Sequence, residues 1–189
     1  MLNKKFLGLI GVGYWGKNLA RDFHRLGVLK TVSDVDNEAK KEVRKISKNI
    51  LYKSDYNQIL KDKEITSVAI ATPARTHYKI VKDCLNANKN VFVEKPLCLN
   101  YNDGKKLVLL AKKNKVKLMI GHLMLYHPAF VKMLQTIKKG KIGKVRYIYS
   151  NRLALGKLRK EEDVLWSFAP HDISMILQLV NEKLISVKA

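Results

Sequence analysis

Cysteine is scarce in this chain. The 189 residues include only Cys84 and Cys98, which form no Cys-x-x-Cys pair and have no metal-ligand spacing around them. A disulfide-stapled scaffold and a cysteine-based zinc site are therefore excluded. We expect a reduced, cytoplasmic protein with two buried thiols.

Acidic residues are also few, with 16 Asp and Glu against 37 Lys and Arg, for a formal net charge of +21. This excess favours anionic partners by long-range attraction but does not choose among them. Most of the basic residues are lysines spread through every predicted helix, without an arginine-rich arm, a helix-turn-helix signature or an aromatic platform. A lysine-rich solvated surface is therefore favoured over nucleic-acid binding.

Long apolar runs are missing as well, so no segment is predicted to span a membrane. The hydrophobic content of 47% excludes a disordered chain and provides for one complete domain and part of another. We expect a small-molecule substrate as the partner, and neither nucleic acid nor membrane.

Glycines are present where a dinucleotide-binding turn needs them. An apolar run at residues 6–10 leads into Gly11, Gly13 and Gly16, with Tyr14 and Trp15 between them. The first glycine permits a tight turn, the second lets backbone amides approach a pyrophosphate, and the third lets a helix pack on its strand. This pattern predicts a dinucleotide site whose phosphates lie at a helix N-terminus.

Asp34 supplies the second part of that site. It lies about twenty residues beyond the glycines, where a carboxylate ends the second strand and accepts hydrogen bonds from ribose hydroxyls. Because the same carboxylate would repel a 2′-phosphate, we expect NAD in preference to NADP. Lys40 and Lys41 are near enough to leave NADP as an alternative.

Short apolar runs alternate with amphipathic stretches over the first 121 residues. This rhythm is typical of a Rossmann fold, an α/β doubly wound parallel sheet with helices on both faces. The predicted strands are residues 6–10, 29–33, 68–71, 91–93 and 117–120. We expect the dinucleotide-binding Rossmann domain to span residues 1–121.

The rhythm changes after Gly121. A helix is predicted to begin near Pro128, followed by a strand at 145–151, a helix at about 171–180 and the start of a strand at 184–187. We therefore expect residues 122–189 to form an incomplete α+β domain for substrate binding and oligomerisation. An open sheet edge there would favour a homo-oligomer.

Several motifs together resemble the Gfo/Idh/MocA family of oxidoreductases. They are the glycine turn, ATPARTHY at 71–78, VEKPL at 93–97, GHLMLYHPA at 121–129 and APHDIS at 169–174. Residues 150–172 look most like the branch that oxidises the 3-hydroxyl of UDP-N-acetylglucosamine or its uronic acid. Members of the family normally continue for well over a hundred further residues, so the resemblance implies a C-terminally truncated chain.

The resemblance implies two catalytic residues. Lys95 matches the family lysine that bonds the reacting hydroxyl beside the nicotinamide, and His171, expected at a helix start after Pro170, matches the family base. The two roles can be exchanged, and each residue alone has an ordinary alternative, a solvated lysine and a helix cap. Ser167 stands where many members have an aspartate, so either that aspartate is dispensable in this branch or activity is impaired.

The same resemblance places other residues around the site. Thr72, Pro73 and His77 match the stretch beside the cofactor, although an exposed position at a helix start is an equal alternative for His77. Glu94 matches the acid that bonds the nicotinamide ribose.

Substrate-binding residues are expected in the second domain. They are His122 and Tyr126 at its entry, Trp166 as the floor of a sugar pocket or as a core residue, His171, and Arg152 within a basic stretch that could face a phosphorylated substrate. The spacing of His122 and His127 is poor for sharing a metal, and we expect no metal.

Three hypotheses of function remain. The favoured one is an NAD-dependent dehydrogenase of a sugar nucleotide. The second is a non-catalytic dinucleotide-binding or interaction fragment, and the third, motivated by charge alone, is a nucleic-acid-associated protein.

Overall fold

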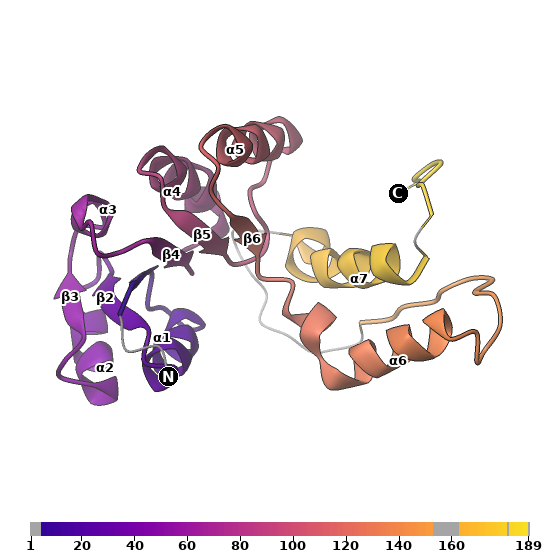
Figure 1. Cartoon of the computed structure of the whole chain (residues 1–189), viewed down its shortest axis with the longest axis horizontal. Coiled ribbons are helices and arrows are strands. Elements are labelled where there is room, and N and C mark those ends of the chain that lie inside the picture. Colours follow the sequence, from indigo (N-terminus) through magenta and orange to yellow (C-terminus); the bar gives the residue numbers. More distant parts are fainter. Residues whose placement is uncertain (1–4, 153–162, 181, 189) are drawn as a thin grey trace. The chain divides into compact units, whose positions relative to one another are not determined.

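The computed structural model describes residues 5–152, 163–180 and 182–188. Contacts between residues divide the chain into two compact units, Met1–Gly121 and His122–Ala189. Figure 1 labels the helices and strands of both units.

The first unit is built on a six-stranded parallel sheet with the strand order β3-β2-β1-β4-β5-β6. The strands are β1 (Leu7–Ile10), β2 (Leu29–Ser33), β3 (Leu51–Lys53), β4 (Ser67–Ile70), β5 (Asn90–Val93) and β6 (Leu118–Ile120). The order reverses between β1 and β4, which is the switch point where doubly wound sheets bind their ligands. The predicted Rossmann fold is therefore confirmed.

Five helices cover the sheet, α1 and α2 on one face and α3, α4 and α5 on the other (Figure 1). Their bounds are α1 (Gly16–Arg25), α2 (Glu38–Ile46), α3 (Asn57–Lys61), α4 (Ala74–Asn86) and α5 (Tyr101–Lys113). Asn100 caps α5, since its side chain accepts from the backbone of Asn102 and Asp103.

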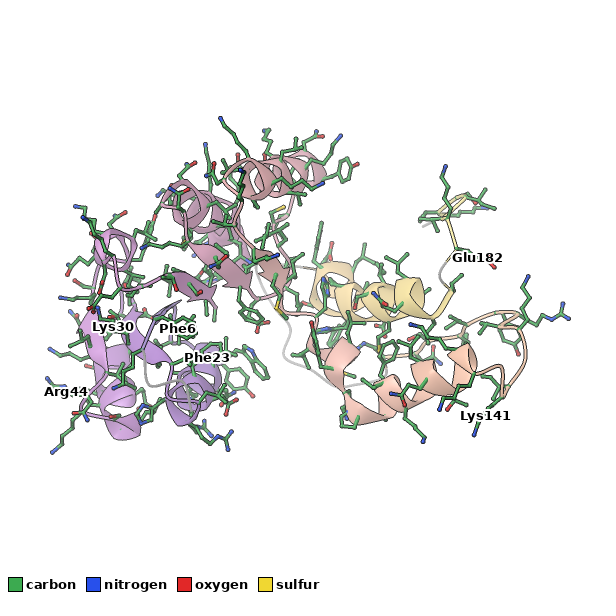
Figure 2. The ribbon with its side chains drawn as sticks, in the orientation of Figure 1. Phe6, Phe23, Lys30, Arg44, Lys141 and Glu182 are labelled. Atoms are coloured by element: carbon green, nitrogen blue, oxygen red, sulfur yellow. The ribbon has the colours of Figure 1, made fainter. Side chains whose placement is uncertain are left out.

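Side chains alternate along β1 to fill both faces of the sheet. Leu7 and Leu9 join the cluster formed with α1 and α2, and Ile10 joins the cluster under α3, α4 and α5. Phe6 and Phe23, both labelled in Figure 2, pack against the first of these clusters.

Gly8 lets β1 approach α3 closely. A Cβ at this position would lie 2.5 Å from Cγ2 of Ile59, a fully buried residue of α3. Gly8 therefore serves the packing of the sheet, although it precedes the glycine turn by only a few residues.

Two lysines form hydrogen bonds at the end of the sheet opposite the glycine turn, where the parallel strands begin. Lys89 is buried, and its ammonium group donates to the backbone carbonyls of Asp62 and Ile65 at 2.8 and 2.6 Å. Lys30, labelled in Figure 2, donates to the carboxylates of Asp62 and Glu64 at 2.5 and 2.6 Å. Desolvation lowers the pKa of Lys89, whereas hydrogen bonds to the two carboxylates raise the pKa of Lys30.

The regular secondary structure described in the second unit is helical. Its helices are the 3₁₀ helix η1 (Leu123–Tyr126), α6 (Pro128–Lys138) and α7 (Val164–Val180), and η1 packs against both longer helices. The helix predicted near Pro128 is confirmed. Phe130 is the one buried hydrophobic side chain among the residues described in this unit.

Three predictions for the second unit are wrong. Residues 145–151 and 184–187 form no strand, and α7 begins at Val164 rather than near residue 171. A strand needs a neighbour for its hydrogen bonds, and the described part of this unit contains none. The earlier helix start is explained by Asp163, whose carboxylate accepts from the backbone N–H of Trp166 at 2.8 Å.

Candidate cofactor and active site

Gly11 and Gly16 shape the turn that follows β1. Gly11 has a φ of +92°, and a Cβ on it would lie 2.8 Å from the backbone of Ala71. A Cβ on Gly16 would lie 2.2 Å from the carbonyl oxygen of Gly11. These two glycines are therefore required by the fold itself, one for the turn and one for the close packing of α1.

Gly13 is different. A Cβ on Gly13 would meet no atom of the described residues within 4 Å, and Gly13 is not among the glycines with positive φ. Neither packing nor backbone conformation thus explains a glycine here. Close approach of a ligand phosphate to the backbone does, so the turn fits a dinucleotide.

Asp34, the first residue after β2, is held beside the same turn. Its Oδ2 accepts from the backbone N–H of Val12 at 2.6 Å, and its Oδ1 accepts from that of Asp36 at 2.9 Å. A cavity of about 410 Å³ is lined by Val12, Gly13 and Asp34 and continues along α2. The predicted phosphate turn and the predicted ribose acid therefore open into one cavity.

Cations on α2 border this cavity, but each is paired. Lys41 lies 2.7 Å from Glu38, and Lys45 lies 2.5 Å from Glu42. The bond to Lys45 lowers the pKa of Glu42, which keeps this pair charged. A 2′-phosphate beside Asp34 would have to compete with these carboxylates, which favours NAD.

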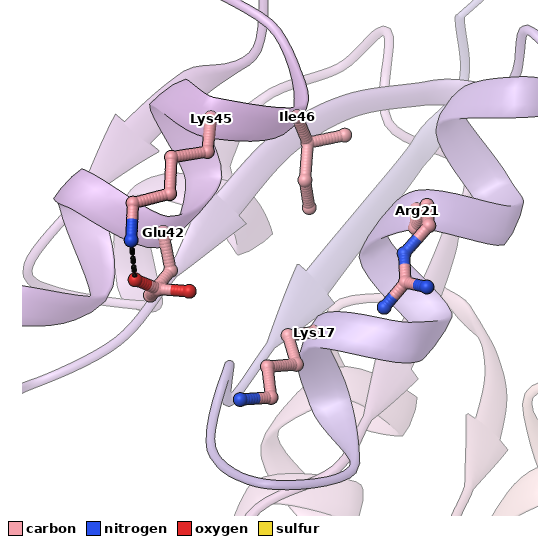
Figure 3. Close-up of a pocket in the computed structure, with 5 residues that line it drawn as sticks. All are labelled: Lys17, Arg21, Glu42, Lys45 and Ile46. Atoms are coloured by element: carbon pink, nitrogen blue, oxygen red, sulfur yellow. Dashed lines mark hydrogen bonds and ion pairs between the residues drawn. The ribbon is translucent and has the colours of Figure 1, made fainter.

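A second cavity of about 290 Å³ adjoins the first between α1 and α2 (Figure 3). Glu42 and Lys45 line both cavities, while Lys17, Arg21 and Ile46 line only the second. Figure 3 shows Lys17 and Arg21 reaching from α1 and the Glu42–Lys45 pair reaching from α2.

His77 joins the loops that follow β4 and β5. Its Nδ1 lies 2.6 Å from the carbonyl oxygen of Pro96, and its Nε2 lies 2.8 Å from that of Thr72. Only 1% of the residue is exposed. The alternative of an exposed position at a helix start is therefore wrong, and both ring nitrogens of His77 face protein carbonyls.

The neighbours of His77 in the same stretch are more accessible. Thr72 is half-buried, and its hydroxyl accepts from that of Thr76 at 2.7 Å, while Pro73 is exposed. Lys95 is half-buried in the loop after β5.

Glu94 lies directly after β5 and contacts the glycine turn. Its Oε1 accepts from the indole N–H of Trp15 at 2.8 Å. A Cβ on Gly121 would lie 3.0 to 3.2 Å from the Glu94 carboxylate, so the glycine after β6 leaves the space that this carboxylate fills. Burial raises the pKa of Glu94, against the lowering effect of the Trp15 bond.

The second unit holds the remaining predicted residues. His171 lies within α7, one residue beyond Pro170, rather than at a helix start. Its neighbour Asp172 accepts from Arg152 at 2.6 Å and from the Ser150 hydroxyl at 3.1 Å. Arg152 is thus held by the residue that follows the expected base.

Three further predicted substrate-binding residues, His122, Tyr126 and Trp166, differ in how exposed they are. Nδ1 of His122 is buried without a hydrogen-bond partner among the described residues, and desolvation lowers the pKa of the imidazole. Tyr126 is 66% exposed and Trp166 is 36% exposed, so Trp166 is not a core residue of the described unit.

Two features of this site were missed by sequence reasoning. The space that Gly121 leaves for Glu94 had no signal beyond a glycine ending an apolar strand. The ion pair of Arg152 and Asp172 joins residues 20 apart whose pairing no periodicity predicts.

The described residues contain no group of His, Cys, Asp or Glu arranged to hold a metal. Within the same ranges, no helix has the length and apolar character needed to cross a membrane.

Residues 6–122 match the model of an oxidoreductase family, GFO_IDH_MocA, described as an NAD-binding Rossmann fold. The chain is 29% identical over 183 residues to a UDP-N-acetylglucosamine 3-dehydrogenase of Acidithiobacillus ferrooxidans, covering 96% of this chain and 56% of that protein. It is also 29% identical over 191 residues to a myo-inositol 2-dehydrogenase of Thermotoga maritima, covering 97% of this chain and 57% of that protein. The chain therefore spans little more than half the length of these relatives.

A solved structure shares the fold. Scyllo-inositol dehydrogenase from Lactobacillus casei, with bound NAD(H) and scyllo-inositol, aligns with a TM-score of 0.77 and 17% identity. The alignment covers 94% of this chain and 56% of that one.

Proposed function

The chain belongs to the Gfo/Idh/MocA family of oxidoreductases and carries its NAD-binding Rossmann domain, and from this premise we propose that it oxidises a secondary hydroxyl on a sugar ring. NAD, when bound, supplies the hydride acceptor for such an oxidation. The observation that carries the proposal is the open space at Gly13, beside the fixed carboxylate of Asp34.

The cofactor is held, in this proposal, from both sides of the switch point in the sheet. Backbone amides at Gly13 bind the phosphates, and Asp34 accepts from the adenosine ribose. The loops after β1 and β4 border the same end of the sheet with four further residues, Tyr14, Trp15, Thr72 and Pro73. His77 acts by holding the loops that carry Thr72 and Lys95 in place, because both of its ring nitrogens are engaged by those loops.

Two residues act on the reacting hydroxyl in this proposal. Lys95 donates a hydrogen bond to the reacting hydroxyl and stabilises negative charge that develops on its oxygen. His171 takes the hydroxyl proton as general base, a role suited to an imidazole at neutral pH. The proposal requires the two side chains to meet at a single hydroxyl.

We propose a UDP-activated N-acetylhexose or its uronic acid as the substrate, oxidised at C3, with His122, Tyr126, Arg152 and Trp166 around the sugar. Support comes from the similarity of residues 150–172 to that branch and from the relative that acts on UDP-N-acetylglucosamine. The inositol dehydrogenase is equally similar, and inositol also presents a ring of secondary hydroxyls.

A second candidate is a dinucleotide-binding chain without catalysis. It is favoured by Ser167, which stands where many members of the family have an aspartate and so replaces an expected charge with a hydroxyl. Binding of NAD without turnover would distinguish it from the enzyme.

The experiment follows NADH formation with three compounds, namely UDP-N-acetylglucosamine, its uronic acid and myo-inositol. We expect turnover with a UDP-sugar, and a loss of about a hundredfold or more in Lys95→Met and in His171→Asn. Lys105→Met is the matched control, because Lys105 is an exposed lysine of α5. Undiminished turnover in the Lys95 and His171 variants would contradict their assignment, and turnover with inositol alone would refute the UDP-sugar.

A further inference from the structure

One hydrogen bond links two distant parts of the cofactor edge. The indole N–H of Trp15 donates to Oε1 of Glu94 at 2.8 Å, across 79 residues of sequence. Trp15 follows the turn after β1, Glu94 follows β5, and β4 lies between these two strands in the sheet. The bond therefore crosses the edge of the sheet above the end of β4.

Trp15 is not held there by a hydrophobic core. It remains 42% exposed and belongs to neither cluster of buried residues in the sheet. A large aromatic side chain that is this exposed and makes a specific polar contact is placed by that contact rather than by burial.

Glu94 needs such a donor. Its carboxylate is half-buried, and burial raises its pKa. The groups that oppose this effect are the Trp15 indole, the backbone N–H and the charge of Lys95 on the same loop, and the charge of His77 from α4. Gly121, from the end of β6, presents only backbone to the carboxylate.

We propose that Trp15 is a positioning residue, which keeps the Glu94 carboxylate ionised and aimed so that it can accept a hydrogen bond from a ribose hydroxyl of the cofactor. This inference rests on the proposed function and on the role that the family resemblance implies for Glu94, which is to bond the nicotinamide ribose. It adds that the glycine turn acts on both ends of the dinucleotide, on the phosphates through its backbone and on the nicotinamide end through Trp15.

The contact itself is tested without cofactor. The chain has two tryptophans, so a proton NMR spectrum contains two indole N–H signals, and Trp15→Phe assigns them. We expect the Trp15 signal to move as pH falls and Glu94 becomes protonated, and we expect that movement to be absent in Glu94→Gln. If the Trp15 signal moves with pH in Glu94→Gln as it does in the parent protein, the inference is overturned.

The consequence for binding is tested by calorimetric titration with NAD between pH 5 and pH 8. Affinity should fall as pH falls, because a protonated Glu94 accepts the hydrogen bond from the ribose hydroxyl more weakly than the carboxylate does. Trp15→Phe keeps an aromatic ring but removes the donor, so the loss of affinity should begin at a higher pH than in the parent protein and should approach about tenfold at the acid end of the range. Tyr101→Phe, an exposed aromatic on α5, is the control and should match the parent protein.

The outcomes separate the two proposals. If the parent protein binds NAD and Trp15→Phe has the parental affinity across the whole pH range, the role of Trp15 is refuted while the proposed function stands. If the parent protein does not bind NAD, the proposed function fails and the inference fails with it, whatever the NMR titration shows.

Discussion

Replacing Gly13 with alanine should separate cofactor binding from folding. The added methyl group would have no atom of the residues that the structure describes within 4 Å, and the backbone of Gly13 is not in the left-handed region. Gly→Ala at such a position raises the free energy of unfolding by about 0.4–1 kcal/mol, through the entropy of the unfolded chain. The melting temperature of Gly13→Ala should therefore be unchanged or slightly raised.

Cofactor affinity should change in the opposite direction. Phosphates that approach the backbone of Gly13 would collide with the new methyl group, so we expect NAD affinity to fall at least about tenfold, equivalent to roughly 1.4 kcal/mol. Gly8→Ala, on the strand β1 that leads into the glycine turn, is the matched control. Its Cβ would lie 2.5 Å from Cγ2 of Ile59, and overpacking of this kind costs about 1–3 kcal/mol of stability.

Calorimetry with NAD and thermal unfolding, carried out on both variants, check this prediction. The expected result is weak binding with a normal melting temperature for Gly13→Ala, and normal binding with a lowered melting temperature for Gly8→Ala. Parental NAD affinity in Gly13→Ala would refute the conclusion that this glycine is kept for a ligand.

Three further predictions concern stability and association. Lys89→Met removes two hydrogen bonds to backbone carbonyls and should lower the free energy of unfolding by about 2 kcal/mol, as measured by urea denaturation. An unchanged midpoint would show that water replaces the ammonium group. Because the pKa of Glu94 is raised in the fold, its contribution to stability is present in acid and is lost as pH rises through that pKa. Glu94→Gln should accordingly raise the melting temperature at pH 7.5 but not at pH 4, and an equal effect at both values would exclude ionisation as the cause. The second unit exposes large apolar side chains along α7, among them Leu165, Ile173 and Leu177. We therefore expect light scattering to show self-association, or amide hydrogen exchange to show weak protection beyond residue 121. A strict monomer with strong protection of these residues would contradict this prediction.

The sequence predicted the first unit well because its signals are local. Apolar runs mark β1, β2, β4, β5 and β6, and the glycine turn and Asp34 lie at strand ends, where the fold makes them neighbours. Among the strands, β3 was missed, since LYK is too short and too polar to stand out from a loop. Its pairing with β2 gives these residues a place in the sheet.

The second unit was predicted less well because its structure depends on partners. Residues 145–151 alternate like a strand, yet Tyr147 and Tyr149 are 85% and 80% exposed, and no described strand lies beside them. Pro170 suggested a helix start, but the capping carboxylate of Asp163 begins the helix earlier and leaves the proline inside it.

In the first unit, the hydrogen bonds of His77 and Trp15 could not be predicted from the sequence either. They join separate loops, and no local pattern encodes them.

The central conclusion is that the edge formed by Gly13 and Asp34 binds NAD. Calorimetric titration of the parent chain and of Asp34→Ala, with NAD and with NADP in turn, tests it most directly. We predict that the parent binds NAD more tightly than NADP, and that Asp34→Ala weakens NAD binding while narrowing the difference between the two cofactors. Tighter binding of NADP by the parent, or an Asp34→Ala variant with the parental preference, would contradict this account.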